Sequence, residues 1–136
     1  MRHVAANSHC FSADVNAAFD PIYGEVHERR NASYINYGVV VTKYTGARGK
    51  AGTNDATAEM MGFARHILDA EHVGWQTGEL GKVDQGGGGT VAMYVSQHNI
   101  DTVDLGVPVL SMHAPFEVVA KADVYMTYRA MRAFYK

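Results

Sequence analysis

The 136-residue sequence has one cysteine, three prolines and no excess of charge of either sign. Because Cys10 stands alone, an internal disulfide and a cysteine-rich zinc motif are both excluded. Lysine and arginine total 12 against 14 aspartates and glutamates, so charge gives no reason to expect nucleic acid or an anionic membrane as a partner. So little cysteine is typical of a reducing compartment, and we expect a cytoplasmic protein.

Long apolar runs are also absent. None approaches the roughly 20 residues that a membrane-spanning helix needs, and the first ten residues include Arg2, His3, Asn7 and His9, which interrupt any signal-peptide stretch. Apolar residues make up 47% of the chain and charged residues 19%, a globular balance. The length fits one domain that can bury a core without disulfides.

Residue patterns predict an α/β fold. Strands are expected at residues 10–15, 37–44, 73–77 and 102–110, and helices at 53–68, 90–97 and 115–135. In the first strand, Phe11, Ala13 and Val15 alternate with polar residues, and Pro115 is placed at the first position of the last helix. Strands alternate with helices from residue 38 onward, which predicts a mixed, mostly parallel sheet flanked by helices.

Asp14 and His113 each come at the end of an apolar strand. In open α/β sheets, ligands collect at the carboxyl edge of the strands, and a carboxylate with an imidazole there suits zinc, cobalt or manganese. The alternative is an aspartate that caps a turn and a histidine that hydrogen-bonds to a backbone carbonyl. Glu117, expected near the third residue of the last helix, would either cap that helix or orient the His113 ring.

Four consecutive glycines, Gly86 to Gly89, precede the helical pattern at 90–97. At a helix start, their N–H groups would cradle an anion. A phosphate-binding P-loop is excluded, since the Lys-Ser/Thr ending is missing and Asp84 would repel phosphate. The glycines otherwise permit close approach to a substrate or simply a tight turn. Lys43, in a positive loop with Arg48 and Lys50, would face a substrate carboxylate or only solvent.

Six segments, in this order along the chain, resemble the family of aspartyl aminopeptidases and vacuolar-type aminopeptidase I, which are zinc metallo-aminopeptidases. They are CFSAD at 10–14, AFDP at 18–21, KYTG at 43–46, RGK at 48–50, DQGGGGT at 84–90 and SMHAPFE at 111–117. Residues 15–18 lack the histidine of the aspartyl-type branch, which favours the aminopeptidase I-like branch.

The resemblance implies a two-zinc site in an aminopeptidase-type fold that hydrolyses N-terminal residues from peptides. Asp14 matches a ligand of one metal and His113 a ligand of the other. Glu117 would orient His113, and Lys43, Gly87 and Gly88 would contact the peptide. It also implies that the full enzyme forms a homo-oligomer.

Two parts of the family pattern are missing from this chain. The His-x-Asp that supplies the bridging carboxylate and the Glu-Glu pair that supplies the base do not occur. Residues 1–136 are therefore expected to be the C-terminal part of a catalytic domain, with an incomplete fold, no catalytic base and no activity alone. A non-catalytic α/β assembly module and an anion-binding domain that uses the glycines remain as alternatives.

Overall fold

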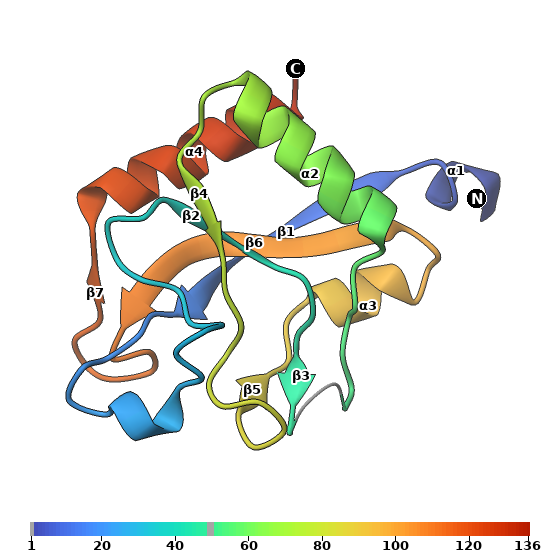
Figure 1. Ribbon diagram of the computed structural model, residues 1–136. Helices are drawn as coiled ribbons and strands as arrows, with labels where there is room; N and C mark the ends of the chain where they lie inside the picture. Colours follow the sequence, from blue (N-terminus) through green and yellow to red (C-terminus); the bar gives the residue numbers. More distant parts are fainter. Residues whose placement is uncertain (1, 49–50) are drawn as a thin grey trace.

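A central mixed sheet organises the chain, as seen in a computed structural model that describes residues 2–48 and 51–136 (Figure 1). The strands lie in the order β1-β6-β2-β4, and β7 pairs with the far end of β6. A second sheet consists of β3 and β5. The elements are α1 (Arg2–Ala5), β1 (His9–Ala17), η1 (Gly24–Val26), β2 (Val39–Thr42), β3 (Gly46–Ala47), α2 (Ala58–Ala70), β4 (Trp75–Thr77), β5 (Gly87–Gly88), α3 (Ala92–Ser96), β6 (Asp101–Leu110), β7 (Val118–Val119) and α4 (Lys121–Phe134).

Strand directions divide the main sheet into two halves. β1 runs parallel to β6 over nine residue pairs, from His9↔Asp101 to Ala17↔Val109. β2 runs parallel to β4 but antiparallel to β6. The carboxyl ends of β1 and β6 therefore lie at one edge of the sheet, and those of β2 and β4 lie at the opposite edge. The predicted mixed α/β sheet is confirmed.

Helices α2 and α4 cover one face of the sheet, and α3, β3 and β5 lie on the other side (Figure 1). The covered face carries the apolar core, in which Val39, Val103 and Leu105 are fully buried. Helix α2 contributes Met60, Ala64 and Leu68, the helical spacing seen in the sequence. Its N-cap is Thr57, whose hydroxyl accepts the Met60 N–H at 3.1 Å, so the helix begins later than the predicted residue 53.

The last helix begins later than predicted. Pro115 lies in a turn, Val118 and Val119 pair with β6, and α4 starts at Lys121. The helix is fixed at its start by Asp123, which is buried and accepts the backbone N–H groups of Asn36 and Gly38 at 2.7 and 2.8 Å. The pairing of β7 with β6 takes up the residues that would form the first turn of a helix beginning at Pro115.

The first strand is longer than predicted, and burial does not simply follow its alternation of apolar and polar residues. Phe11 is buried against the helices, whereas Ala13 and Val15 on the same face are exposed because the helices do not reach them. The polar side instead holds buried Ser12 and Asn16. The predicted loop at 45–50 contains the short strand β3, and its residues 49 and 50 lie outside the described residues.

Candidate metal-ligand and substrate-binding residues

Asp14 lies within β1, an edge strand of the described sheet, rather than at the end of its strand. β1 continues for three residues beyond it, to Ala17, and its register partner is Gly106 of β6. A Cβ on Gly106 would stand 1.5 Å from the Asp14 carbonyl oxygen, so only glycine permits this approach. One carboxylate oxygen accepts the Val15 N–H at 2.8 Å, and the partly exposed side chain remains accessible.

Beside Asp14, the same face of the sheet holds a buried polar layer that sequence patterns did not reveal. The Asn16 amide donates to the Thr42 hydroxyl at 3.0 Å and accepts from the Ser33 hydroxyl at 2.7 Å. Asp104, opposite Ser12 in the β1–β6 register, is 3% exposed. Its place among the apolar residues of β6 was the available signal, because a charged residue is rarely buried without a reason.

Burial raises the pKa of Asp104 to about 6. The Ser12 hydroxyl acts in the opposite direction, the Asp14 charge raises the pKa further and the Thr90 hydroxyl lowers it. Two ionisable carboxylates thus share one face of the sheet, with Asp104 inside and Asp14 at the surface.

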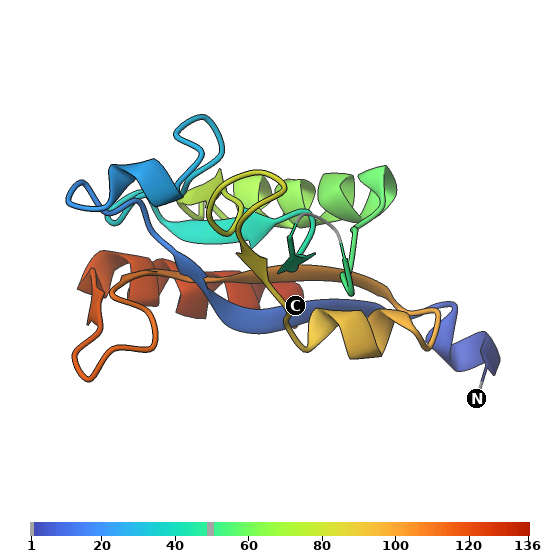
Figure 2. The ribbon, with the colours of Figure 1, turned by 90° about the horizontal axis from the view of Figure 1, so that it is seen from below.

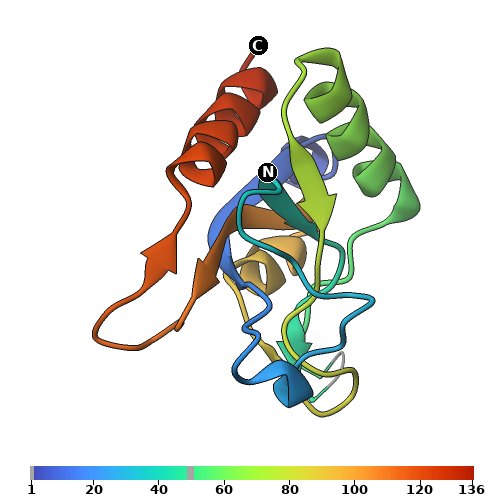
Figure 3. The same cartoon turned by 60° about the vertical axis from the view of Figure 1, so that its left-hand side comes forward.

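His113 and Glu117 lie together in the exposed turn between β6 and β7, which projects from the rest of the chain (Figure 3). Glu117 accepts the His113 backbone N–H at 2.5 Å, and Ala114 N–H donates to Ser111 carbonyl oxygen at 3.0 Å. Ser111 and His113 have φ angles of 59° and 68°, the left-handed region that costs non-glycine residues energy. Glu117 does reach a backbone N–H, but it closes this turn and does not cap α4.

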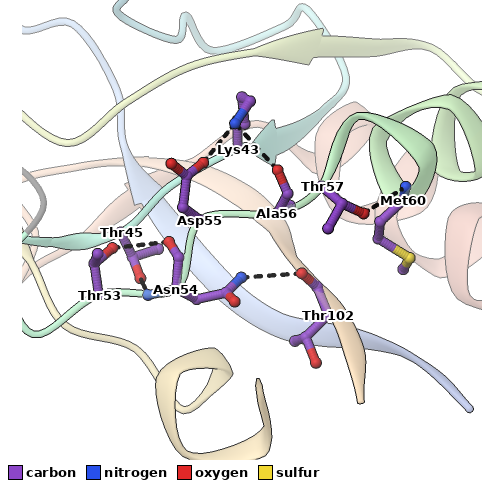
Figure 4. A network of polar contacts seen from close by, with 9 residues as sticks. All are labelled: Lys43, Thr45, Thr53, Asn54, Asp55, Ala56, Thr57, Met60 and Thr102. Atoms are coloured by element: carbon purple, nitrogen blue, oxygen red, sulfur yellow. Dashed lines mark hydrogen bonds and ion pairs between the residues drawn. The ribbon is translucent and has the colours of Figure 1, made fainter. Parts of the chain in front are cut away.

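Lys43 follows β2 and is held by neighbouring residues (Figure 4). Its ammonium donates to Asp55 at 2.5 Å and to the Ala56 carbonyl oxygen at 3.1 Å. Because β2 and β6 are antiparallel, Lys43 and His113 leave the sheet at opposite ends of β6. Figure 2 shows the same separation: the orange β6–β7 turn lies at the end of the sheet away from α3.

The four glycines do not open a helix. Gly87 and Gly88 form β5 and pair with Ala47 and Gly46 of β3, and α3 begins only at Ala92. Gly87 has a φ of 114°, and a Cβ there would lie 1.9 Å from the Gly46 carbonyl oxygen. The glycines serve close backbone pairing, so they do not form the helix start that the anion-binding alternative requires.

Glu79 is a buried carboxylate that sequence reasoning missed. It lies two residues beyond β4, is 9% exposed and has one oxygen, Oε2, that is buried without a hydrogen-bond partner in the described structure. Burial raises its pKa to about 7, opposed by backbone hydrogen bonds from Tyr44 and Lys43. A glutamate between Gly78 and Leu80 carries no motif that marks it as buried.

The described residues do not complete a metal site. Among residues 2–48 and 51–136, no group of three or more histidine, cysteine, aspartate or glutamate side chains is placed to hold an ion. Zinc sites need three or four protein ligands or water, so Asp14 and His113 fit zinc by donor type but are not a sufficient set.

The helices of the described chain also include none long and apolar enough to cross a bilayer.

A parallel β1–β6 pair with a carboxylate on one strand and an imidazole after the other is compatible with a metallohydrolase of α/β type. Comparison with known proteins gives the family: the model for aminopeptidase I zinc metalloprotease (M18) matches residues 1–135. The chain belongs to this family of aminopeptidases.

Individual relatives support the family assignment. A probable M18 family aminopeptidase 1 of Clostridium acetobutylicum is 51% identical over 134 residues, which are 98% of this chain and 29% of that protein. The crystal structure of aminopeptidase I from the same organism matches with a TM-score of 0.94 at 50% identity, over 99% of this chain and 30% of that one. An M18 aminopeptidase structure from Thermotoga maritima matches with a TM-score of 0.93 at 48% identity, over 97% of this chain and 29% of that one. The chain therefore spans about 30% of the length of these relatives.

Proposed function

We propose that this chain supplies part of the two-metal site of a peptide-hydrolysing aminopeptidase, with Asp14 on one zinc ion and His113 on the other. The observation that carries the proposal is the parallel pairing of β1, which contains Asp14, with β6, which leads into the turn that contains His113. Family membership supplies the reaction class. Cobalt or manganese would suit the same ligands.

Bound metal ions would polarise the scissile carbonyl and lower the pKa of a shared water. In this chain, Glu117 accepts the His113 backbone N–H and so restrains the turn that carries the imidazole. Lys43, Gly87 and Gly88 contribute the peptide-binding surface in the proposal. The base and the bridging carboxylate are absent from the sequence, so we expect the isolated chain to bind zinc weakly and to hydrolyse no peptide.

The proposal also covers the assembly and the cellular location of the whole enzyme. We expect the full enzyme to form a homo-oligomer, as the resemblance to its family implies. We expect a cytoplasmic location, supported only by the single cysteine.

The first experiment assays the purified 136-residue chain for zinc-dependent release of N-terminal residues from peptides, and measures zinc binding by calorimetry. The Clostridium acetobutylicum relative, assayed in parallel, serves as the active control. No release and weak binding are expected. Robust zinc-dependent release by the chain alone would contradict the proposal.

The second experiment joins the chain to a segment that carries the missing His-x-Asp and Glu-Glu. In an active fusion, D14N and H113A should each lower kcat/KM by about 100-fold or more, and E117Q by about 10-fold to 100-fold. The matched controls D69N and H66A change exposed residues of α2 and should leave the rate unchanged. Equal rates for D14N, H113A and their controls would reject the assigned metal ligands.

A further inference from the structure

Glu79 and Lys43 occupy equivalent positions at the carboxyl edge shared by β2 and β4. The parallel register pairs Val41 with Thr77, and each of the two residues lies two positions further along its own strand. The carboxyl of Glu79 lies within reach of the backbone N–H groups of Lys43 and Tyr44, which lower its pKa, and Glu79 and Tyr44 line one cavity. The ends of β2 and β4 therefore meet at this side chain, beyond the point where the strands cease to pair.

Glu79 is itself held firmly from a third segment. Its N–H donates to the Asn31 carbonyl oxygen at 2.7 Å. The preceding Gly78 packs so closely that an added Cβ would lie 2.8 Å from the Ser33 Cβ. The backbone of residues 78–79 is thus fixed between residues 31–33 and β2, which gives the carboxyl a defined place from which to act.

The glycine strand lies on the other side of this carboxyl. Glu79, Tyr44 and Gly46 line one small cavity together with Gly86 and Gly87, and its volume of about 10 Å³ has room for about one water molecule. Gly46 and Gly87 belong to the paired strands β3 and β5. Glu79 therefore adjoins both segments to which the peptide-binding role is assigned.

We propose that Glu79 is a positioning residue, whose buried carboxyl holds the backbone of Lys43 and Tyr44 and thereby sets where Lys43 and the β3–β5 strands meet a peptide. The role of Lys43 in peptide binding rests on the proposed function. The restraint of the backbone by Glu79 does not depend on it.

The restraint depends on pH, because an ionised carboxylate accepts N–H hydrogen bonds more strongly than a protonated one. Burial raises the Glu79 pKa to about 7, so the restraint tightens as pH rises through neutrality. The charged groups around it are Lys43 on β2, Asp55 on the following segment, and Lys82 and Asp84 on the loop that lines the cavity. Residues 31–33, packed on the remaining side, are uncharged.

The test follows the backbone amide signals of Lys43 and Tyr44 by NMR in the 136-residue chain between pH 5 and 9. In the unmodified chain, both signals should shift with a common midpoint near pH 7. The shift should disappear in E79Q, which keeps the shape of the side chain but not its titration. It should persist in E71Q, in which an exposed glutamate at the end of α2 is changed.

Absence of a pH-dependent shift at both amides in the unmodified chain would overturn the proposal, and this result needs no variant to fold. Persistence of the shift in E79Q would overturn it too, because another group would then be titrating. The measurement requires no peptidase activity. Its failure therefore leaves the proposed function standing, and an inactive fusion protein leaves this inference standing.

Discussion

The two faces of the central sheet are both largely buried, but they are built from opposite kinds of residue. On the helix-covered face, Val39, Val103 and Leu105 pack against α2 and α4. On the opposite face, Asn16, Thr42 and Asp104 are equally inaccessible. Burying an aliphatic side chain contributes about 1.5–3 kcal/mol to folding, whereas a buried polar group costs free energy unless it is hydrogen-bonded.

The difference indicates that the two faces of the sheet have different roles. The apolar face stabilises the sheet, and the polar face carries Asp14 together with the network around Asn16. A protein that buries an incompletely partnered carboxylate, as at Asp104, gives up stability at that position. Such a loss of stability is common at functional sites, and Asp104 lies on the face where the chemistry is proposed to take place.

The largest predicted effect comes from the apolar face. Leu105→Ala removes a fully buried side chain and leaves a cavity, so the free energy of unfolding should fall by about 2–5 kcal/mol. Urea unfolding followed by Trp75 fluorescence measures it. The matched variant V15A alters a residue that is 38% exposed, and it should change stability by less than about 0.5 kcal/mol. Similar losses for both would mean that burial beneath the helices is not what makes Leu105 stabilising.

The next effect tests the close approach of β1 and β6 at Gly106, on which both faces depend. In Gly106→Ala, the new methyl would overlap the Asp14 carbonyl oxygen, and the β1–β6 pair must separate locally. We expect a loss of about 1–3 kcal/mol and altered NMR signals at Asp14. The control G62A places a methyl in open space on α2 and should stabilise the chain by about 0.5–1 kcal/mol. A G106A chain as stable as the original would contradict the register.

How much of this was predictable from sequence depends on the kind of signal. The helix predicted at 53–68 is found as α2, whose buried Met60, Ala64 and Leu68 recur at helical spacing, because helical periodicity follows directly from burial on one side. The apolar run around Val103 and Leu105 located the buried strand. Both signals are local in sequence, and both were confirmed.

The polar face and the loops depend on contacts between distant segments. Asp104 and Glu79 are buried by residues far along the chain, and no local pattern encodes that burial. The glycines became strand β5 because Gly46 and Ala47 pair with them, about 40 residues earlier in the sequence. The start of α4 moved for the same reason, since β7 pairs with β6. Asp14 and His113 were singled out by their place after apolar strands, and the resemblance then gave each a role as a metal ligand.

A smaller effect comes from the charge on the polar face. The Asp104 pKa is raised from 3.8 to about 6, so the folded chain binds more protons than the unfolded chain between these values. Ionisation of Asp104 therefore lowers the free energy of unfolding as the pH rises from about 4 to 6. The free energy of unfolding stays at this lower value at higher pH. D104N should remove about 1–2 kcal/mol of this fall, measured by urea unfolding at pH 4 and pH 8.

The control for that measurement is D101N, at the exposed start of the same strand. It should preserve the whole pH dependence. Burial of Glu79 adds a fall of the same sign up to about pH 7, so D104N should flatten mainly the lower part of the curve. An unchanged curve in D104N would show that Asp104 is not the titrating group on this face.

The smallest effect concerns an ion pair that belongs to neither face. Lys43 and Asp55 are 2.5 Å apart, but their side chains are 47% and 37% exposed. Exposed pairs contribute little, since solvent screens the attraction and ordering two side chains costs entropy. Asp55→Asn should therefore change the free energy of unfolding by less than about 1 kcal/mol. E71Q is the matched control, because it breaks the Glu71–Lys136 pair, of similar length and exposure. If D55N destabilised the chain by several kcal/mol while E71Q did not, Asp55 would be part of the buried polar structure, and the division into two faces would have to extend to the segment around Lys43.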